Sequence, residues 1–468
     1  MNNLSIVPQN EQRQFSLIES LAGQIMKTVI YGGAALAQLN SRLLCTLLAR
    51  GEPDLPIEDQ PTLYVFPIDK QPERAFRIYA DDDISADLVR EARLNASQPT
   101  VLLIHGWLGG INNEFWLSQA RTTVLRSNML AESVTGFKAN TIVVDWSQFA
   151  EGSLYTATRN SLTVSKRLGR MLRRLYQLDA ITPQLTHCLG HSIGAHICGQ
   201  AARIAFLNVT TPTSVPSPWR NLQTVASSSQ VKLGRITGLD PGGFCYELNI
   251  QNESIYAGLR PSDAHLVDAY YTNRSPFGNR YQVAHYNVRI NNAFLQRSCQ
   301  VWRNSTHATE YFRATVRFLF GNVGHNDIIT CDHYFATELA HQALSGTPHC
   351  SFVSFSCDSY RSFVRGRCGE CASNEQCYSM DAEYQKPTPS IMNIWRKLKA
   401  DAKQVANQNI GNVQNEVATS GTLYDDRLVY YMRTRSVAPL CSKYDSLRVA
   451  YHTWATHETN QLSYRSNV

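Results

Sequence analysis

The chain has 468 residues, of which 43% are hydrophobic and 18% are charged. This composition excludes wholesale disorder, and the length allows one large domain with appendages or two domains. The net charge of +6 is a mild excess spread along the chain, so nucleic acid is not expected as a partner.

The first 58 residues are predicted to form an N-terminal extension. Residues 1–20 are polar, and a short apolar run, Val29 to Leu39, contains an A-x-A pattern typical of signal-peptide cleavage sites. Residues 15–49 are therefore interpreted either as one amphipathic helix, which could associate with a membrane surface, or as a poor signal segment. Nowhere in the chain is an apolar run long enough to predict a transmembrane helix.

Strand and helix patterns alternate from residue 62 onward. After strand-like alternation over Thr62–Tyr79, five apolar and β-branched runs are typical of strands buried on both faces, and one segment has helical spacing. The runs are Thr100–Ile104, Thr141–Trp146, Leu185–Leu189, Gly234–Asp240 and Leu266–Tyr271, and the helix is Leu162–Leu178. This alternation predicts an α/β fold, a mostly parallel sheet with helices on both faces.

The pentapeptide Gly190-His191-Ser192-Ile193-Gly194 has the pattern G-x-S-x-G and lies between an expected strand and an expected helix. That context predicts a nucleophile elbow, a sharp turn that exposes a serine hydroxyl at the end of the sheet. Side chains at the two glycine positions would collide with the neighbouring strand and helix. We therefore expect Ser192 to be a nucleophile.

A serine nucleophile needs a histidine base, a carboxylate that orients the base, and two backbone N–H donors for the oxyanion. Asp240 lies at a later strand end and is the candidate carboxylate. The spacing alone leaves four candidate bases: His265, His285, His325 and His333. The N–H donors are expected from Ile193, directly after the nucleophile, and from Trp107 in the turn after an earlier strand.

Twelve cysteines are present, and seven of them lie from Cys299 to Cys377. Such crowding predicts disulfides formed in an oxidising compartment. The competing interpretation is a zinc site at Cys368 and Cys371, which have C-x-x-C spacing but no second matching pair. Six N-x-S/T sequons agree with a secretory route and predict a glycoprotein. They begin at Asn3, Asn95, Asn208, Asn252, Asn273 and Asn304.

Several motifs occur in collinear order between about Tyr64 and Cys441. They are IHGW at 104–107, VDW at 144–146, GHSIGAH at 190–196, GRITGLDPGG at 234–243, SDAHLVDAYYT at 262–272, and YYMRTRSVAPLC at 430–441. Together they resemble the pancreatic lipase family of α/β-hydrolase lipases and phospholipases A1. The resemblance implies an α/β-hydrolase domain over residues 59–445 and the triad Ser192, Asp240 and His333.

The resemblance also implies a set of disulfides. By position these are Cys299–Cys331, which closes a lid loop over Gln300–Thr330, together with Cys357–Cys368 and Cys371–Cys377. Cys441 is expected to pair as well, with Cys350 as its partner. Cys45 and Cys245 have no assigned partner. Cys188 and Cys198, on either side of the elbow, also have none and are expected to be buried thiols.

Four features depart from the family pattern. Insertions are predicted at 208–230 and 386–422, and only a tail, 446–468, follows the domain. The C-terminal lipid-binding β-sandwich of the pancreatic enzymes is thus not expected, nor is a colipase partner. The family's calcium-site region corresponds to Ile255–Asp263, where only Asp263 remains of the acidic ligands, so neither calcium nor another cofactor is expected.

The resemblance implies a secreted hydrolase of lipid carboxylic esters that works through an acyl-enzyme at a lipid–water interface. The apolar and basic residues of the expected full-length lid favour triacylglycerol lipases over phospholipases A1. The alternative is a catalytically weak or inactive lipid-binding protein on the same fold, similar to the yolk proteins of flies.

Overall fold

The computed structural model describes residues 61–66, 75–80, 84–111, 120–121, 124, 139–152, 154–207, 209, 230–249, 258–274, 277–293, 296, 299, 330–345, 352–368, 377–380 and 429–432. The chain divides into two compact units, Met1–Gly51 and Glu52–Val468, and all described residues belong to the second. The predicted extension at 1–58, the insertion at 386–422 and the tail at 446–468 lie outside the described residues. So do nearly all of the insertion at 208–230 and of the lid loop.

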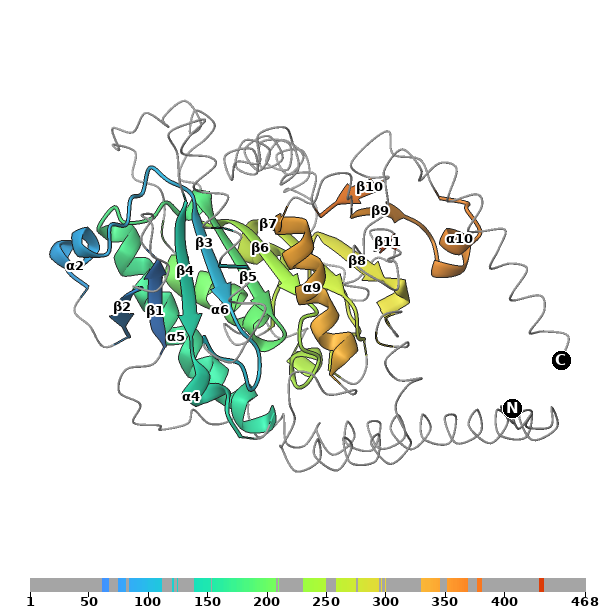
Figure 1. Cartoon of the computed structure of the whole chain (residues 1–468), viewed down its shortest axis with the longest axis horizontal. Helices are drawn as coiled ribbons and strands as arrows, with labels where there is room; N and C mark the ends of the chain where they lie inside the picture. Colours follow the sequence, from blue (N-terminus) through green and yellow to red (C-terminus); the bar gives the residue numbers. More distant parts are fainter. Residues whose placement is uncertain are drawn as a thin grey trace, which may run out of the picture. The chain divides into compact units, whose positions relative to one another are not determined.

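The second unit is built on one sheet, in which the described residues form eleven strands in the order β10-β9-β11-β8-β7-β6-β5-β3-β4-β1-β2 (Figure 1). The six central strand pairs, from β11–β8 through to β3–β4, are parallel. At the edges, β1 and β2 on one side and β9 and β10 on the other pair antiparallel to their neighbours. The strands are β1 (Thr62–Phe66), β2 (Phe76–Tyr79), β3 (Thr100–Ile104), β4 (Asn140–Asp145), β5 (Thr186–His191), β6 (Leu233–Leu239), β7 (Ala264–Tyr271), β8 (Tyr286–Ile290), β9 (Val353–Ser356), β10 (Cys377–Ser379) and β11 (Val429–Met432).

Helices cover both faces of the sheet (Figure 1). Alternate residues of β3 show the two layers: Leu102 and Ile104 pack with α4, α5 and α6, whereas Val101 and Leu103 face the layer that contains α9. The helices are α2 (Ala86–Glu91), α4 (Ser147–Ala150), α5 (Leu154–Gln177), α6 (Ile193–Phe206), α9 (Cys331–Ser345) and α10 (Tyr360–Val364). The short 3-10 helices are η1 (Pro183–Leu185), η3 (Tyr246–Asn249), η4 (Pro261–Asp263) and η5 (Asn291–Ala293). The predicted α/β architecture is confirmed.

The long buried runs of the sequence are strands of the observed sheet. Thr100–Ile104 is β3 as predicted, and the other four runs match β4, β5, β6 and β7 to within two residues at either end. The strands β8 to β11 were not predicted. Among the described helices, none combines the length and the apolar character required to cross a membrane.

Three disulfides are formed among the described residues: Cys188–Cys198, Cys299–Cys331 and Cys357–Cys368. The expectation that Cys188 and Cys198 are free thiols is wrong. The helix α6 folds back along β5 and brings the Cα atoms of Cys188 and Cys198 to 6.0 Å from each other. Both residues lie in the apolar surroundings that suggested free thiols.

The other cysteine predictions have mixed outcomes. Cys245 and Cys377 are also disulfide-bonded. The zinc interpretation is wrong for Cys368, because its sulfur is bonded to that of Cys357. Cys45, Cys350, Cys371 and Cys441 lie outside the described residues. The three described disulfides fit a protein that matures in an oxidising compartment.

Candidate active site

Ser192 occupies the sharp turn between β5 and α6, with φ 55° and ψ −120°. This backbone conformation is strained for a residue with a side chain, and it persists only where the surroundings enforce it. Cβ atoms built on the flanking glycines show the constraint: the one on Gly190 would lie 2.4 Å from Gly194 C, and the one on Gly194 2.5 Å from His105 O. Strand, turn and helix therefore form the elbow that the G-x-S-x-G pattern predicts.

Asp240 follows the carboxyl end of β6 and is fully buried. Its Oδ1 accepts hydrogen bonds from the backbone N–H groups of Thr272 (2.8 Å) and Asn273 (3.1 Å). Burial raises the pKa of Asp240, and the hydrogen bonds from His333 and these two N–H groups counteract only part of this effect. Asn273 is itself buried, so its sequon is not accessible as a glycosylation site in the folded protein.

His333 lies in the first turn of α9, and its Nδ1 is 2.6 Å from Asp240 Oδ2. Its ring stacks on Phe277, with ring centroids 5.4 Å apart, and contacts the ring of His191 at 4.7 Å. The imidazole is therefore fixed by a carboxylate at one nitrogen and by two rings on its faces. Because Nδ1 faces the carboxylate, Nε2 is left for proton transfer.

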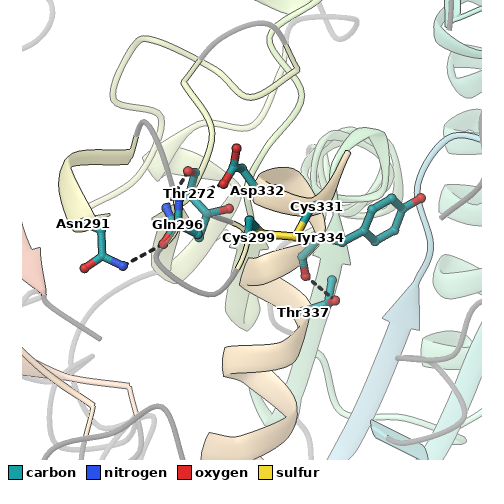
Figure 2. The surroundings of a disulfide bond; sticks show 8 residues. All are labelled: Thr272, Asn291, Gln296, Cys299, Cys331, Asp332, Tyr334 and Thr337. Atoms are coloured by element: carbon teal, nitrogen blue, oxygen red, sulfur yellow. Dashed lines mark hydrogen bonds between the residues drawn. A yellow bond between two sulfur atoms is a disulfide. The ribbon is translucent and has the colours of Figure 1, made fainter. Parts of the chain in front are cut away.

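A disulfide joins the start of α9 to Cys299, and the buried Gln296 links the start of α9 to the end of β7 (Figure 2). Cys331 is bonded to Cys299, and the backbone N–H of Gln296 donates to Asp332 Oδ1 at 2.7 Å. The Gln296 amide in turn donates to Thr272 O at 2.7 Å. Since the N–H of the same Thr272 binds Asp240, these contacts join the elements that carry His333 and Asp240.

Ser192 and His333 line one pocket together with the two expected oxyanion donors. Trp107 follows β3, and Ile193 is the first residue of α6, where backbone N–H groups have no partner within the helix. Most of the other side chains in the lining are apolar or aromatic. The full lining is Trp107, Leu108, Leu154, Thr158, His191, Ser192, Ile193, Gly242, Phe244, Tyr246, Phe277, Thr330, His333 and Tyr334.

The two other candidate bases within the described residues, His265 and His285, lie away from this pocket. His265 is near the amino end of β7, and His285 directly precedes β8, which runs parallel to β7. Asp240 lies at the opposite ends of these parallel strands, beyond the carboxyl end of β6. His285 Nδ1 instead accepts the backbone N–H of Val267 at 3.0 Å. His325 lies outside the described residues.

The described part of the calcium-site region, Gly258–Asp263, does not fit a calcium ion. Asp263 is buried, and its Oδ1 lies 2.5 Å from the guanidinium of Arg203. Its Oδ2 accepts the backbone N–H of Arg260 at 2.8 Å, and a Cβ on Gly199 would lie 2.3 Å from that same oxygen. A calcium ion needs six to eight oxygen ligands, whereas here a guanidinium already binds the carboxylate.

His196 holds the loop that follows Asp240, and sequence reasoning did not single it out. Its Nε2 lies 2.7 Å from Gly242 O, which can only accept, and its Nδ1 accepts the N–H of Leu259 at 2.9 Å. Burial lowers the pKa of His196 to about 3, so the ring is neutral and can serve both partners. Gln296 was missed too, and nothing in its sequence surroundings distinguishes it.

Comparisons with known proteins identify relatives. Phospholipase A1 member A of Mus musculus is 29% identical over 283 residues, which cover 60% of this chain and 49% of that protein. Hepatic triacylglycerol lipase of Rattus norvegicus is 26% identical over 331 residues, which cover 68% of this chain and 58% of that protein. The chain thus spans about half the length of the curated relatives it matches.

Among solved structures, a native esterase, Est2, from the Planctomycetes species Thermogutta terrifontis aligns with 64% of this chain and 96% of its own, at 12% identity and a TM-score of 0.22. A family model described as Lipase matches residues 68–391, which is more than half of the chain and includes the elbow, Asp240 and His333. The chain therefore belongs to the lipase family, as its resemblance to the pancreatic lipases implied.

Proposed function

We propose that this protein is a serine carboxylic ester hydrolase of the lipase type, with Ser192 as nucleophile, His333 as general base and acid, and Asp240 as the group that orients the base. The observation that supports this most is the 2.6 Å contact between His333 Nδ1 and Asp240 Oδ2, beside a pocket that also contains the strained Ser192.

The reaction follows from these positions. Asp240 accepts a hydrogen bond from His333 Nδ1–H, which keeps the proton on Nδ1 and leaves Nε2 unprotonated and ready to act as a base. Ser192 Oγ attacks the ester carbonyl while His333 takes its proton, and His333 then gives this proton to the departing alcohol. Water, activated by the same imidazole, hydrolyses the acyl-enzyme and releases the acid. The proposed reaction requires no cofactor.

The oxyanion of each tetrahedral intermediate would be bound by the backbone N–H groups of Trp107 and Ile193. The second donor has electrostatic support from its place at the start of α6, where the helix dipole favours negative charge. Gly242 leaves room there: a Cβ at this position would lie 3.6 Å from both Ser192 Oγ and Ile193 N.

The proposed substrates are lipid esters at a lipid–water interface. The pocket supports this through its apolar wall, which includes Leu154, Tyr246 and Phe277. The relatives named phospholipase A1 and triacylglycerol lipase agree with the same substrate class. We favour triacylglycerols over phospholipids because of the aromatic and basic sequence between Cys299 and Cys331, which would form the lid. Secretion is proposed on the basis of the disulfides.

Replacing Ser192 with alanine tests the proposal. The variant should lose at least about 1000-fold in kcat for a short-chain nitrophenyl ester, because the nucleophile is gone while the fold is kept. Turnover equal to that of the wild type would contradict the assignment. Labelling with a fluorophosphonate probe distinguishes the alternative: folded protein without an adduct at Ser192 would favour a non-catalytic lipid-binding role.

A further inference from the structure

The peptide unit between Gly106 and Trp107 lies directly against the elbow. A Cβ on Gly106 would lie only 2.9 Å from Ser192 Cβ, so the backbone here approaches the nucleophile too closely for any side chain at this position. We propose that His105 is a positioning residue that sets the orientation of this peptide unit and thereby aims Trp107 N–H at the oxyanion. The inference rests on the proposed function, in which that N–H is one of the two oxyanion donors.

The side chain of His105 binds the carbonyl half of this peptide unit. His105 Nδ1 lies 2.9 Å from Gly106 O, and because a carbonyl oxygen can only accept, Nδ1 carries the proton. A trans peptide is planar, and its C=O and N–H point in opposite directions. Fixing Gly106 O on one side therefore fixes the direction of Trp107 N–H on the other.

His105 is itself held rigidly by the segment that follows β4. Its Nε2 accepts the backbone N–H of Trp146 at 3.1 Å, and its ring stacks on the Trp146 indole, with centroids 5.2 Å apart and planes 8° from parallel. The indole N–H donates to His105 O at 2.9 Å. The residue is completely buried. An imidazole bound in this way has one orientation, and that orientation presents Nδ1–H to Gly106 O.

Asp145 lies beside the same imidazole ring. Its Oδ1 lies 3.3 Å from His105 Nε2 and accepts the backbone N–H of Ser147 at 3.1 Å. The N–H of Ser147 fixes this carboxylate beside the imidazole ring, whose Nε2 accepts the N–H of Trp146 and so donates no hydrogen bond to Asp145.

The residues that follow Trp107 are anchored separately. The N–H of Leu108 donates to Ala150 O at 2.9 Å, and the indole N–H of Trp107 donates to Gly152 O at 2.9 Å. These bonds fix the loop downstream of the peptide unit. Gly106 O also accepts a long bond of 3.2 Å from Gly109 N–H. Among the described residues, the side-chain donor to Gly106 O is His105, and this makes the inference testable by substitution.

The test compares three variants at this position in the full chain. The Nδ2–H of an asparagine overlies histidine Nδ1–H, whereas the amide of a glutamine reaches the position of Nε2, and a leucine offers no donor. His105→Leu and His105→Gln should lower kcat for a soluble nitrophenyl ester about 100-fold with little change in KM, near the cost of losing one oxyanion donor. His105→Asn should recover most of the wild-type kcat.

Two results would overturn the inference: wild-type kcat in His105→Leu, or an asparagine variant no more active than the glutamine variant when both are folded. If His105→Leu does not fold, the comparison of His105→Asn with His105→Gln carries the test, with thermal unfolding measured for both. A crystal structure of His105→Gln in which Gly106 C=O keeps its direction would also overturn it. Failure of the proposed function is seen separately, as hydrolysis that persists in Ser192→Ala.

Discussion

Two buried carboxylates on neighbouring strands differ in what they face. Asp240, just after β6, has His333 as its side-chain partner, and burial raises its pKa. Asp268, inside β7, contacts Arg235 at 2.5 Å and accepts hydrogen bonds from Thr237 and Tyr378. Burial would raise the pKa of Asp268 too, but the Arg235 cation holds it below the usual value. The same side chain, equally buried, thus has opposite pKa shifts.

The difference separates a reactive site from a framework. Arg235 remains protonated at all relevant pH values, so the Asp268 pair is a fixed arrangement of charge that ties β6, β7 and β10 together. His333 can gain and lose a proton, so the negative charge of Asp240 acts on a partner whose charge changes during a reaction cycle. Activity should therefore depend on Asp240, and stability on Asp268.

The largest expected effect concerns Asp240. In Asp240→Asn, the side-chain oxygen still accepts the N–H groups of Thr272 and Asn273, which places the amide NH2 group against His333 Nδ1. An NH2 group can only donate, so the imidazole adopts the wrong tautomer. We expect kcat for a nitrophenyl ester to fall about 1000- to 10,000-fold. Chemical denaturation at pH 7 should show no loss of stability, since the variant removes a buried charge. A variant that is stable but fully active would break the comparison.

The matching substitution on the framework side is Asp268→Asn. It leaves the buried Arg235 cation without its anion and should lower the free energy of unfolding by about 3–5 kcal/mol. The kcat of the remaining folded protein should stay near the wild-type value. As a control, Arg235→Met combined with Asp268→Leu removes both charges and should recover much of the stability. If the single and the double variant are equally unstable, the ion pair is not the reason.

The disulfide between β5 and α6 gives the next effect. Closing a loop with a sequence separation of 10 constrains the unfolded chain by about 3 kcal/mol. Replacing Cys188 and Cys198 by alanine should lower stability by roughly this amount, while the strained elbow next to them is kept by Gly190 and Gly194. Denaturant unfolding and ester turnover, measured on one preparation, check this. A large loss of kcat in folded protein would instead show that this disulfide is needed for the geometry of the reactive site.

The smallest effect is a difference in pH dependence. The pKa of Asp268 is lowered, so its contribution to stability is present above the unfolded pKa of about 3.9 and is lost as the pH falls through the folded value. The pKa of Asp240 is raised, so its contribution is present below about pH 3.9 and is lost as the pH rises through the folded value. The stability deficit of Asp268→Asn should thus shrink on acidification to pH 3.

For Asp240→Asn, the stability relative to the wild type should fall over the same acidification. Unfolding curves of the wild type and both variants between pH 3 and pH 7 measure the two slopes. Slopes of the same sign would show that the two carboxylates do not differ as their surroundings indicate.

The sequence predicted the central sheet well, because residues buried on both faces leave continuous apolar runs such as Thr100–Ile104. The short strands β9, β10 and β11 have only three or four residues each, too few to show a periodicity. β11 also pairs with β8, more than a hundred residues earlier in the chain, and no local pattern records such a contact.

The candidate site shows the same limit. The elbow is predictable because strand, turn and helix are contiguous, whereas the residue patterns alone left four histidines open and only the family motifs selected His333. Gln296 joins Thr272 O to Asp332 in the N-terminal turn of α9. The three residues come from separate segments, so no local sequence pattern predicts this link. Cys188 and Cys198 were misinterpreted because an apolar environment suits a buried thiol and a buried disulfide equally well.

The position of β11 has a consequence for how the protein is made. In the sheet, β11 lies between β8 and β9, although it is the last described strand in the chain. While the ribosome is still synthesising residues before 429, the strands β1 to β8 can already assemble, but β8 has an open edge and β9 lacks one neighbour. An emerging chain therefore passes through a period in which this edge can pair with other chains. Chaperones that bind open strand edges would be needed most during that interval.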